Sequence, residues 1–443
     1  MINFLPRLFL SLVKTLYLIN LQSMAAKSSL GVLLSTAILS GTAFSQLPVT
    51  DNLPSFATWL LSSGKDSVTV CAGYSVNYTN LVFLKSGDAR DTFSAFLTFS
   101  ADAIDSATGS NYHRSKSKEV GTPTYEGTRS KKSHAEDFVT LRLPRSVFHI
   151  AAELRDDTQR LTYLHTDVRR DFSEIDSSGF DSIIFFDSVS NSSYHPVIQP
   201  NVAVFPEPIR FGIVCGNTSP EVTRADLLTK EGKLLRGNAN LTRLAAKLRP
   251  ASIGLDLVFL ALPDSNTCIE IGEIRADTLP EGFYQLRIHG KTTQRTFPFC
   301  YSWITKPRTL RNFTTAFSLL KYVVQDSIYS EMESGNEKEK IEKFNHFWRS
   351  LDPTPGTAYN ELEAQFYERA DYADNAFATI GARAGASTDR GKAYILFGKP
   401  DSVKREYKDD GTLEVWSYTK LKKNLIFKEK GFGEFELYRT ENL

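Results

Sequence analysis

The spacing of apolar residues changes once along this chain, at Lys306-Pro307. Before this point, apolar and polar residues alternate in short runs such as 93–99, with turn residues between the runs. After it, apolar residues recur every three or four positions, as in 313–328. A period of two is typical of half-buried strands, and a period near 3.6 of helices with one apolar face. The sequence therefore predicts a long β region followed by a shorter region rich in helices.

The β region divides into two blocks of short predicted strands. The first block covers residues 46–200, with strands at 68–72, 81–84, 93–99, 138–143, 148–154, 161–168 and 182–186. The second covers residues 201–306, with strands at 202–205, 211–214, 257–262, 268–274 and 283–288. Short strands separated by turn residues are typical of two antiparallel sheets packed face to face. We therefore predict two Ig-like β-sandwich domains.

The remaining residues, 307–443, combine helices with a small sheet. Apolar stripes at helical spacing run through 313–328, 341–351 and 359–380, and they predict three helices. The chain then returns to predicted strands, at 393–397, 403–407, 413–418 and around Phe427 and Phe435, with Asp410-Gly411 as a hairpin turn. We predict a C-terminal α+β domain of three helices and an antiparallel meander, so the fold class is mainly β plus α+β.

The segment 106–135 interrupts the first β block and contains few large aliphatic residues. Its basic residues are Arg114, Lys116, Lys118, Arg129, Lys131 and Lys132. This composition predicts a mobile basic loop. The loop is either a solvated surface segment or a contact surface for an anionic glycan or phosphate.

The N-terminus carries the pattern of an export signal, starting at Met1 or, better, at Met24. A positively charged start precedes an apolar run, and Ala43-Phe44-Ser45 predicts cleavage before Gln46. The apolar run is shorter than the ~20 residues that span a bilayer, so we expect no transmembrane segment after cleavage. A signal peptide at 1–45 predicts a protein of the periplasm, the outer-membrane surface or the medium.

Four cysteines, Cys71, Cys215, Cys268 and Cys300, are widely spaced and form no CxxC motif. In an oxidising compartment they permit disulfides with three possible pairings. The alternative is four buried free thiols.

Charge and motifs exclude several functions. The chain has 52 Lys plus Arg against 51 Asp plus Glu, and this balance removes the main argument for a nucleic-acid partner. It contains no GxSxG, no GxxxxGK[ST], no GxGxxG and no HExxH. We therefore expect no cofactor, no metal site and no recognisable catalytic motif.

One segment after the predicted helices concentrates turn-forming and charged residues. It reads Gly385-Ala386-Ser387-Thr388-Asp389-Arg390-Gly391-Lys392-Ala393-Tyr394-Ile395-Leu396-Phe397-Gly398-Lys399-Pro400-Asp401. Glycines allow sharp turns, and short Thr and Asp side chains accept nearby backbone N–H groups. The arginine can pair with either aspartate or lie across the tyrosine. These residues either hold a structural corner or converge on a small anionic-ligand or catalytic site.

This segment resembles the GWxTD domain, a family of exported proteins from Bacteroidota and related bacteria. The likeness rests on the Thr-Asp-Arg-Gly run, the apolar run after it and the Gly-x-Pro-Asp turn, while Ala386 stands where the family motif has Trp. It covers the last third of the chain and implies export, but no biochemical activity. The motif residues are Gly385, Thr388, Asp389, Arg390, Gly391, Tyr394, Gly398, Pro400, Asp401 and, as the hairpin aromatic, Trp416.

The sequence leaves three functions open. The preferred one is a non-enzymatic envelope or secreted protein that binds another envelope protein as an interaction or scaffold module. The second is a glycan-binding β-sandwich protein that uses the basic segment. The third is a hydrolase centred on Asp389, Arg390 and Asp401.

Overall fold

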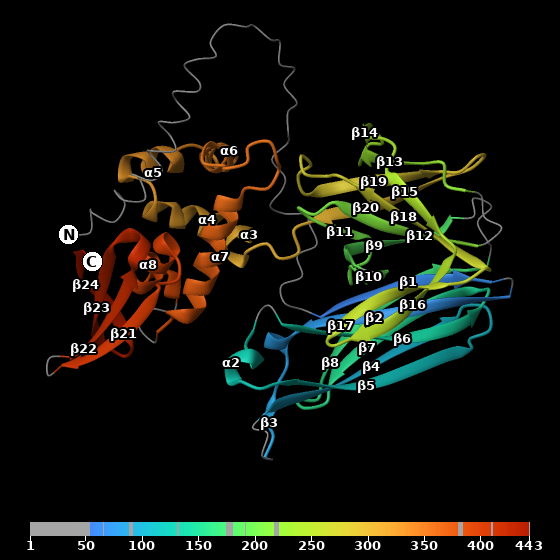
Figure 1. Ribbon diagram of the computed structural model, residues 1–443, viewed down its shortest axis with the longest axis horizontal. Coiled ribbons are helices and arrows are strands. Elements are labelled where there is room, and N and C mark those ends of the chain that lie inside the picture. Colours follow the sequence, from blue (N-terminus) through green and yellow to red (C-terminus); the bar gives the residue numbers. More distant parts are fainter. Residues whose placement is uncertain are drawn as a thin grey trace, which may run out of the picture. The chain divides into compact units, whose positions relative to one another are not determined.

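The computed structural model describes residues 54–442, apart from 65, 88–91, 131–132, 174–179, 191, 217–220, 380–383 and 409–410. The predicted signal peptide at 1–45 lies outside the described residues. The chain divides between Ile304 and Thr305 into two compact units. We call them the β unit, Leu47–Ile304, and the C-terminal unit, from Thr305 onward (Figure 1).

The β unit contains four sheets. Sheet A consists of β1 (Ser55–Ser63), β2 (Ser67–Asn77) and β6 (His134–Pro144), in that order. Sheet B consists of β3 (Leu84–Lys85), β4 (Phe93–Asp105), β7 (Val147–Asp156) and β8 (Leu161–Asp171), with β5 (Asn111–Thr122) also paired to β4. The short helices η2 (Tyr78–Asn80) and α2 (Tyr125–Thr128) connect strands of these two sheets.

The other two sheets are larger or mixed. Sheet C has the order β15 (Asn240–Leu244), β18 (Thr267–Ile274), β12 (Ile209–Gly216), β9 (Phe180–Ser190), β10 (Ser193–Pro196), β17 (Asp256–Pro263), β16 (Ala246–Ile253). Sheet D has the order β11 (Val202–Val204), β20 (Gln294–Ser302), β19 (Gly282–His289), β13 (Arg224–Thr229), β14 (Leu234–Arg236), and its β11–β20 pair is parallel.

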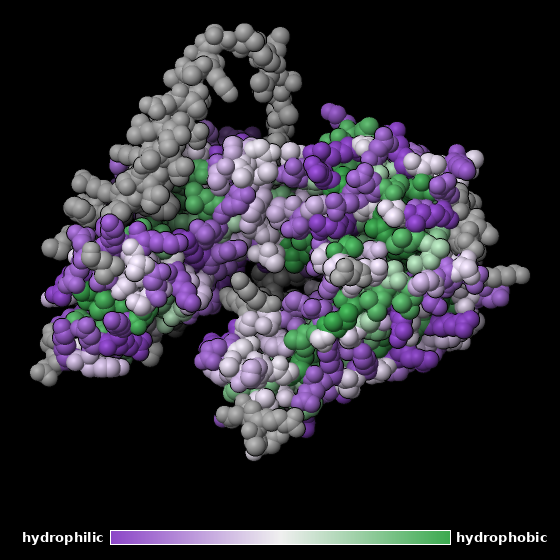
Figure 2. Space-filling model, in the orientation of Figure 1, coloured by the Kyte–Doolittle hydropathy of each residue, from purple (hydrophilic) through white to green (hydrophobic). Residues whose placement is uncertain are grey.

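Sheet A is buried on both faces, because successive side chains of a strand point to opposite sides. Val70 and Ala72 of β2 pack into a core shared with sheet B. Cys71, between them, packs into a second core shared with sheet C. On β1, Trp59 meets Phe259 of sheet C edge to face, with ring centroids 5.3 Å apart. Figure 2 shows hydrophobic side chains at the surface of the β unit between hydrophilic bands.

Sheet C in turn packs on sheet D, where the rings of Phe185 and Phe299 lie 4.9 Å apart. Strand β9 pairs with β12 along most of its length. The predicted domain boundary at residue 200 lies between these two paired strands, which come from opposite sides of that position. The boundary could not be predicted correctly because strand periodicity shows where strands lie but not which strands pair with one another.

The predicted mobile loop at 106–135 is wrong for most of its length. Strand β5 pairs with β4 from Asn111 opposite Ile104 to Thr122 opposite Phe93. Its residues are mostly exposed. The strand therefore lacks the alternation of apolar and polar residues by which strands are predicted from sequence. Only Val120 of this strand is fully buried.

The C-terminal unit places helices beside a four-stranded antiparallel sheet. The helices are α3 (Arg308–Arg311), α4 (Phe313–Leu319), η3 (Leu320–Tyr322), α5 (Asp326–Glu333), α6 (Glu337–Ser350), α7 (Glu361–Ala376), η4 (Gly385–Ser387) and α8 (Asp389–Phe397). Sheet E follows with β21 (Ser402–Lys408), β22 (Gly411–Tyr418), β23 (Lys423–Gly431) and β24 (Glu434–Asn442), and η5 (Thr419–Leu421) lies between β22 and β23. The predicted fold class, mainly β followed by a C-terminal α+β region, is confirmed.

Aromatic side chains form the helical core of this unit. Phe344 and Trp348 of α6 surround Tyr367 of α7, with ring centroids 6.3 Å and 5.6 Å from it. The Tyr367 hydroxyl donates a hydrogen bond to the Ala316 carbonyl at 3.0 Å, so its buried polar atom is satisfied. The 313–328 stripe spans α4, η3 and the start of α5 rather than one continuous helix.

The predicted strand at 393–397 is wrong, because these residues form the second half of helix α8. Ala393, Ile395 and Leu396 are buried there. A short, continuously apolar run fits a buried strand and a buried helix equally well. Among the described residues, no helix is both long enough and apolar enough to cross a membrane.

Candidate functional site

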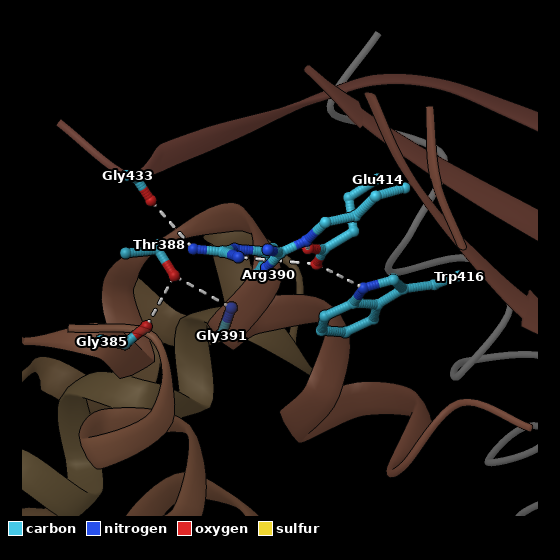
Figure 3. A network of polar contacts seen from close by, with 8 residues as sticks. Gly385, Thr388, Arg390, Gly391, Glu414, Trp416 and Gly433 are labelled. Carbon is cyan, nitrogen blue, oxygen red and sulfur yellow. Dashed lines mark hydrogen bonds and ion pairs between the residues drawn. The ribbon is translucent and has the colours of Figure 1, made fainter. Parts of the chain in front are cut away.

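The start of α8 is held by Thr388, the residue before its first turn. The Thr388 Oγ1 accepts a hydrogen bond from the Gly391 N–H at 3.0 Å and donates one to the Gly385 carbonyl at 2.7 Å (Figure 3). Thr388 is buried. This is the N-cap arrangement that satisfies a free N–H at a helix start.

The two glycines around Thr388 serve close packing rather than a sharp turn. Neither has a positive φ. A Cβ on Gly391 would lie 2.0 Å from the Gly385 carbonyl oxygen, and one on Gly385 would lie 2.4 Å from the Ala373 carbonyl oxygen of α7. The backbone of η4 therefore fits between α7 and α8 only because both positions lack a side chain.

Arg390 and Glu414 form the centre of a polar network under sheet E. The Arg390 Nη1 lies 3.5 Å from Glu414 Oε1, which also accepts a hydrogen bond from the Trp416 Nε1–H at 2.8 Å (Figure 3). The Arg405 Nε donates to the other carboxylate oxygen at 2.9 Å. Because the Glu414 side chain is only 4% exposed, its charge is compensated almost wholly by these three donors.

The Arg390 guanidinium also ties the helix to β24. It donates to the Gly433 carbonyl at 3.0 Å and lies over the Phe435 ring, 4.2 Å from its centroid. Burial lowers the pKa of Arg390, and the Glu414 carboxylate opposes that shift. A cation so enclosed needs its partner, because a buried charge without one is strongly destabilising.

Asp389, Arg390 and Asp401 do not converge. Asp389 accepts a hydrogen bond from the Leu437 N–H at 3.0 Å and pairs with Lys392 at 3.2 Å. Asp401 is exposed and accepts from the Thr419 N–H at 2.7 Å and from its hydroxyl. These hydrogen bonds lower the pKa of Asp401. The expected pairing of Arg390 with either aspartate is therefore replaced by its pairing with Glu414.

The remaining motif residues lie around the other end of α8. Tyr394 stacks on Tyr372 with ring centroids 4.4 Å apart, instead of lying under Arg390. Gly398 has φ 78° at the C-cap, and its carbonyl accepts a hydrogen bond from the Tyr418 hydroxyl at 3.0 Å. Pro400 follows and leads into β21. This end is again a packed corner.

Trp416 contributes to the core between α8 and sheet E. Its ring lies 5.4 Å from Phe377 and 5.0 Å from Phe427. Ala386, at the position of the motif Trp, is 8% exposed in η4. Glu414 was not predicted as a site residue, although its spacing carried a signal. Residues 414, 416 and 418 lie on one face of a strand, and the other two are aromatic.

Two lysines of the basic segment interact with other residues of the β unit. Lys116 Nζ lies 2.5 Å from Asp137 Oδ1, and Lys118 Nζ donates to the Glu136 carbonyl at 2.7 Å. Burial lowers the pKa of Lys118. Arg114, Lys116 and Arg129 are exposed, while Lys131 and Lys132 lie outside the described residues.

One group of side chains in the β unit has metal-ligand chemistry. The His134 Nε2 lies 3.6 Å from Glu136 Oε1 and 3.4 Å from Asp256 Oδ1. Glu136 also accepts a hydrogen bond from the Leu257 N–H at 2.9 Å, and burial raises its pKa. These three ligand atoms all lie within 4.8 Å of one another, a spacing that is compatible with one bound divalent cation.

The four cysteines are buried, and none of them forms a disulfide among the described residues. Cys215 and Cys268 face each other on β12 and β18, and the Cys268 Sγ donates to the Cys215 carbonyl at 3.8 Å. Cys71 lies opposite Trp59 and Thr140 in sheet A instead. Among the possible disulfide pairings, only the one that joins Cys215 to Cys268 links two cysteines that lie directly opposite each other on paired strands.

Two solved structures share little with this chain. The C-terminal domain of the Streptococcus pyogenes antigen I/II-family protein AspA is 8% identical, with a TM-score of 0.17, over 56% of this chain and 98% of that one. The Streptococcus agalactiae AgI/II polypeptide BspA C-terminal domain is also 8% identical, with a TM-score of 0.15, over 56% of this chain and 99% of that one. Both scores are too low to indicate a shared fold.

No curated protein matches this chain. The model of one family does, and it covers residues 282–441, from the first residue of β19 to the second-last residue of β24. This range contains the Thr388 cap, the Arg390–Glu414 pair and Trp416. The chain therefore carries a GWxTD domain at residues 282–441.

Proposed function

We propose that this protein is an exported, non-enzymatic interaction module that binds another envelope protein through the edge of sheet E. The supporting observation is strand β21. It is the first strand in the order β21-β22-β23-β24, and all seven of its residues are exposed. Sheet edges offer unpaired backbone groups to a strand from another chain.

The side chains of β21 add apolar area and charge to this edge. Val403 is 51% and Tyr407 is 80% exposed. Lys404 and Lys408 lie between and beyond them on the same strand. Lysines on an edge discourage unspecific pairing, so the fitting partner is an extended segment with acidic side chains opposite the lysines.

A hydrolase at the motif has weaker support. Each of Asp389, Arg390 and Asp401 is engaged with a different strand or turn, and a catalytic site needs such groups to face one reacting atom. Glycan binding by the basic segment is also weaker, because Lys116 and Lys118 already have partners within the β unit.

Export rests on the signal-peptide pattern before Gln46. N-terminal sequencing of the protein purified from its native cells tests this part. A mature chain that starts at Gln46 supports export, whereas one that starts at Met1 or Met24 contradicts it.

Partner binding can be tested by placing a photocrosslinking amino acid at position 407, with position 125 as the control. Tyr125, in the β unit, is similarly exposed at 57%. We expect a discrete adduct with an envelope protein from position 407 only. Excess wild-type protein without the photocrosslinker should reduce the yield of this adduct. The same excess of the V403K/Y407K variant, which lacks the two exposed apolar residues of β21, should not reduce it. An adduct that forms equally from position 125, or that resists the wild-type competitor, would contradict the proposal.

A further inference from the structure

A cavity of about 420 Å³ opens within the β unit, and its lining is rich in arginine. Arg145, Arg169, Arg170 and Arg295 contribute to it, against one acidic residue, Asp171. The volume is in the range that small-molecule sites occupy. The four arginines come from the loop after β6, from β8 and from β20, so residues far apart in sequence bring positive charge to one place.

Arg170 is partly buried. It lies opposite Phe148 in the β7–β8 register, and Phe148 is fully buried, so the arginine extends from the inner face of sheet B. Its Nη2 donates to Thr58 Oγ1 of β1 at 3.2 Å. Burial lowers the pKa of Arg170.

Neutral groups hold both Arg170 and Arg145. The Arg145 Nε donates to the Gly64 carbonyl at 2.9 Å, and its Nη2 donates to Ser63 Oγ at 2.7 Å. In the part of the chain that the structure describes, no carboxylate lies within the 4.0 Å ion-pair distance of either guanidinium. Each guanidinium has five N–H donors, so several remain for a ligand.

The other two arginines add charge at the sides of the cavity. The Arg295 Nη1 donates to the Phe180 carbonyl. The Arg169 side chain is 64% exposed and lies 4.0 Å from Asp171. Asp171 is exposed and also accepts hydrogen bonds from the N–H and hydroxyl of Ser173, so the cavity lining keeps an excess of positive charge, with four arginines against this one carboxylate.

Arg145 and Arg170 are partly buried like charges that pair with no carboxylate among the described residues. They therefore repel each other, and a bound anion would relieve this repulsion. Arginine is the side chain best suited to oxyanions, because its planar fork donates two parallel hydrogen bonds. The cavity wall also contains apolar side chains, including Leu60, Val70 and Phe297.

We propose that this cavity binds a small organic dianion whose oxyanion group, a phosphate monoester or a dicarboxylate, accepts hydrogen bonds from Arg145 and Arg170. The nonpolar body of the ligand lies against Leu60, Val70 and Phe297. Arg169 and Arg295 raise the positive potential through which the anion enters. This site is separate from the β21 edge, so its test does not depend on the proposed interaction module.

Calorimetric titration of the purified protein tests the site with phenyl phosphate and phthalate as the two dianion sources and phenol as the uncharged probe. We expect at least one dianion to bind, more weakly as NaCl concentration rises, and phenol not to bind. R170Q and R145Q should each weaken binding by about tenfold or more, since a charged hydrogen-bond donor is lost. R142Q is the matched control, because Arg142 lies on β6 outside the cavity and contacts Ser67.

Without ligand, R170Q should have a melting temperature at least as high as that of the wild type. The substitution removes a partly buried cation whose hydrogen-bond partner, the Thr58 hydroxyl, is neutral. If R170Q fails to fold, R145Q decides the question alone. The proposal is overturned if neither dianion binds at millimolar concentration. It is also overturned if R145Q and R170Q bind as tightly as the wild type, or if R142Q weakens binding as much as they do.

Discussion

Glu363 on α7 is a partly buried carboxyl group whose surroundings favour its protonated form. Burial raises the pKa of Glu363 from 4.5 to about 7, although the nearby positive charge of Lys306 opposes the shift. Between these values the folded protein holds a proton that the unfolded chain has released. The free energy of unfolding therefore falls as pH rises from about 4.5 to about 7.

We predict that the wild type loses about 1–3 kcal/mol of stability between pH 5 and pH 8 through this group. In E363Q, which mimics the neutral carboxyl, this part of the pH dependence should vanish. Urea denaturation at both pH values measures the effect, and E368Q, an exposed change on the same helix, is the control. Equal pH slopes in E363Q and the wild type would show that Glu363 ionises normally.

Single residues of the motif were predictable only where their partners are local. The turn chemistry of Thr388 was read from the sequence, because its contacts lie within three residues. Arg390 was not assigned correctly, because Glu414 lies 24 positions away on β22. Two nearer aspartates offered equally good charges, and only the packing of α8 on sheet E selects the distant one.

At the level of single elements, α8 depends on the contact of its first turn with η4. We predict that G391A destabilises the protein by about 2–4 kcal/mol, because a backbone oxygen cannot give way as a flexible side chain can. Chemical denaturation measures the loss. G356A is the matched control, since a Cβ there meets nothing within 4 Å. A G391A protein as stable as G356A would mean that η4 can shift away.

The errors at the element level share one cause. Periodicity identifies which face of an element is apolar, but the second half of α8, residues 393–397, is apolar on every side, and β5 is mostly polar. The first was taken as a strand and the second as a loop. In both cases the neighbours decide the structure: α7 and sheet E enclose α8, and β4 pairs with β5 over twelve residues. Neither neighbour is visible in a local window.

For the whole molecule, the change of period at Lys306-Pro307 lies within three residues of the boundary between the two units, at Ile304 and Thr305. Within the β unit, however, sheet A packs against two sheets. We predict that a fragment of residues 46–304 is monomeric and unfolds in one transition, whereas a fragment of residues 46–200 aggregates. The shorter fragment lacks strands β16 and β17 of sheet C, whose Leu248, Leu257 and Phe259 share a core with Trp59 and Cys71, and large exposed apolar faces cause association.

Size-exclusion chromatography and binding of a hydrophobic dye compare the two fragments. A soluble, dye-negative fragment of residues 46–200 would show that sheets A and B suffice for an independent domain. Two separate transitions in the fragment of residues 46–304 would lead to the same conclusion.

The position of sheet A also limits how such a chain can change over time. Sheet A contributes to two hydrophobic cores, so a recombination event near residue 200 would remove part of sheet C and expose one face of sheet A. The incoming sequence would have to provide a complementary apolar surface in the same event. We therefore expect residues 54–304 to be inherited together. Substitutions on one face of β2 should be compensated by changes in sheet B, and those on the other face by changes in sheet C.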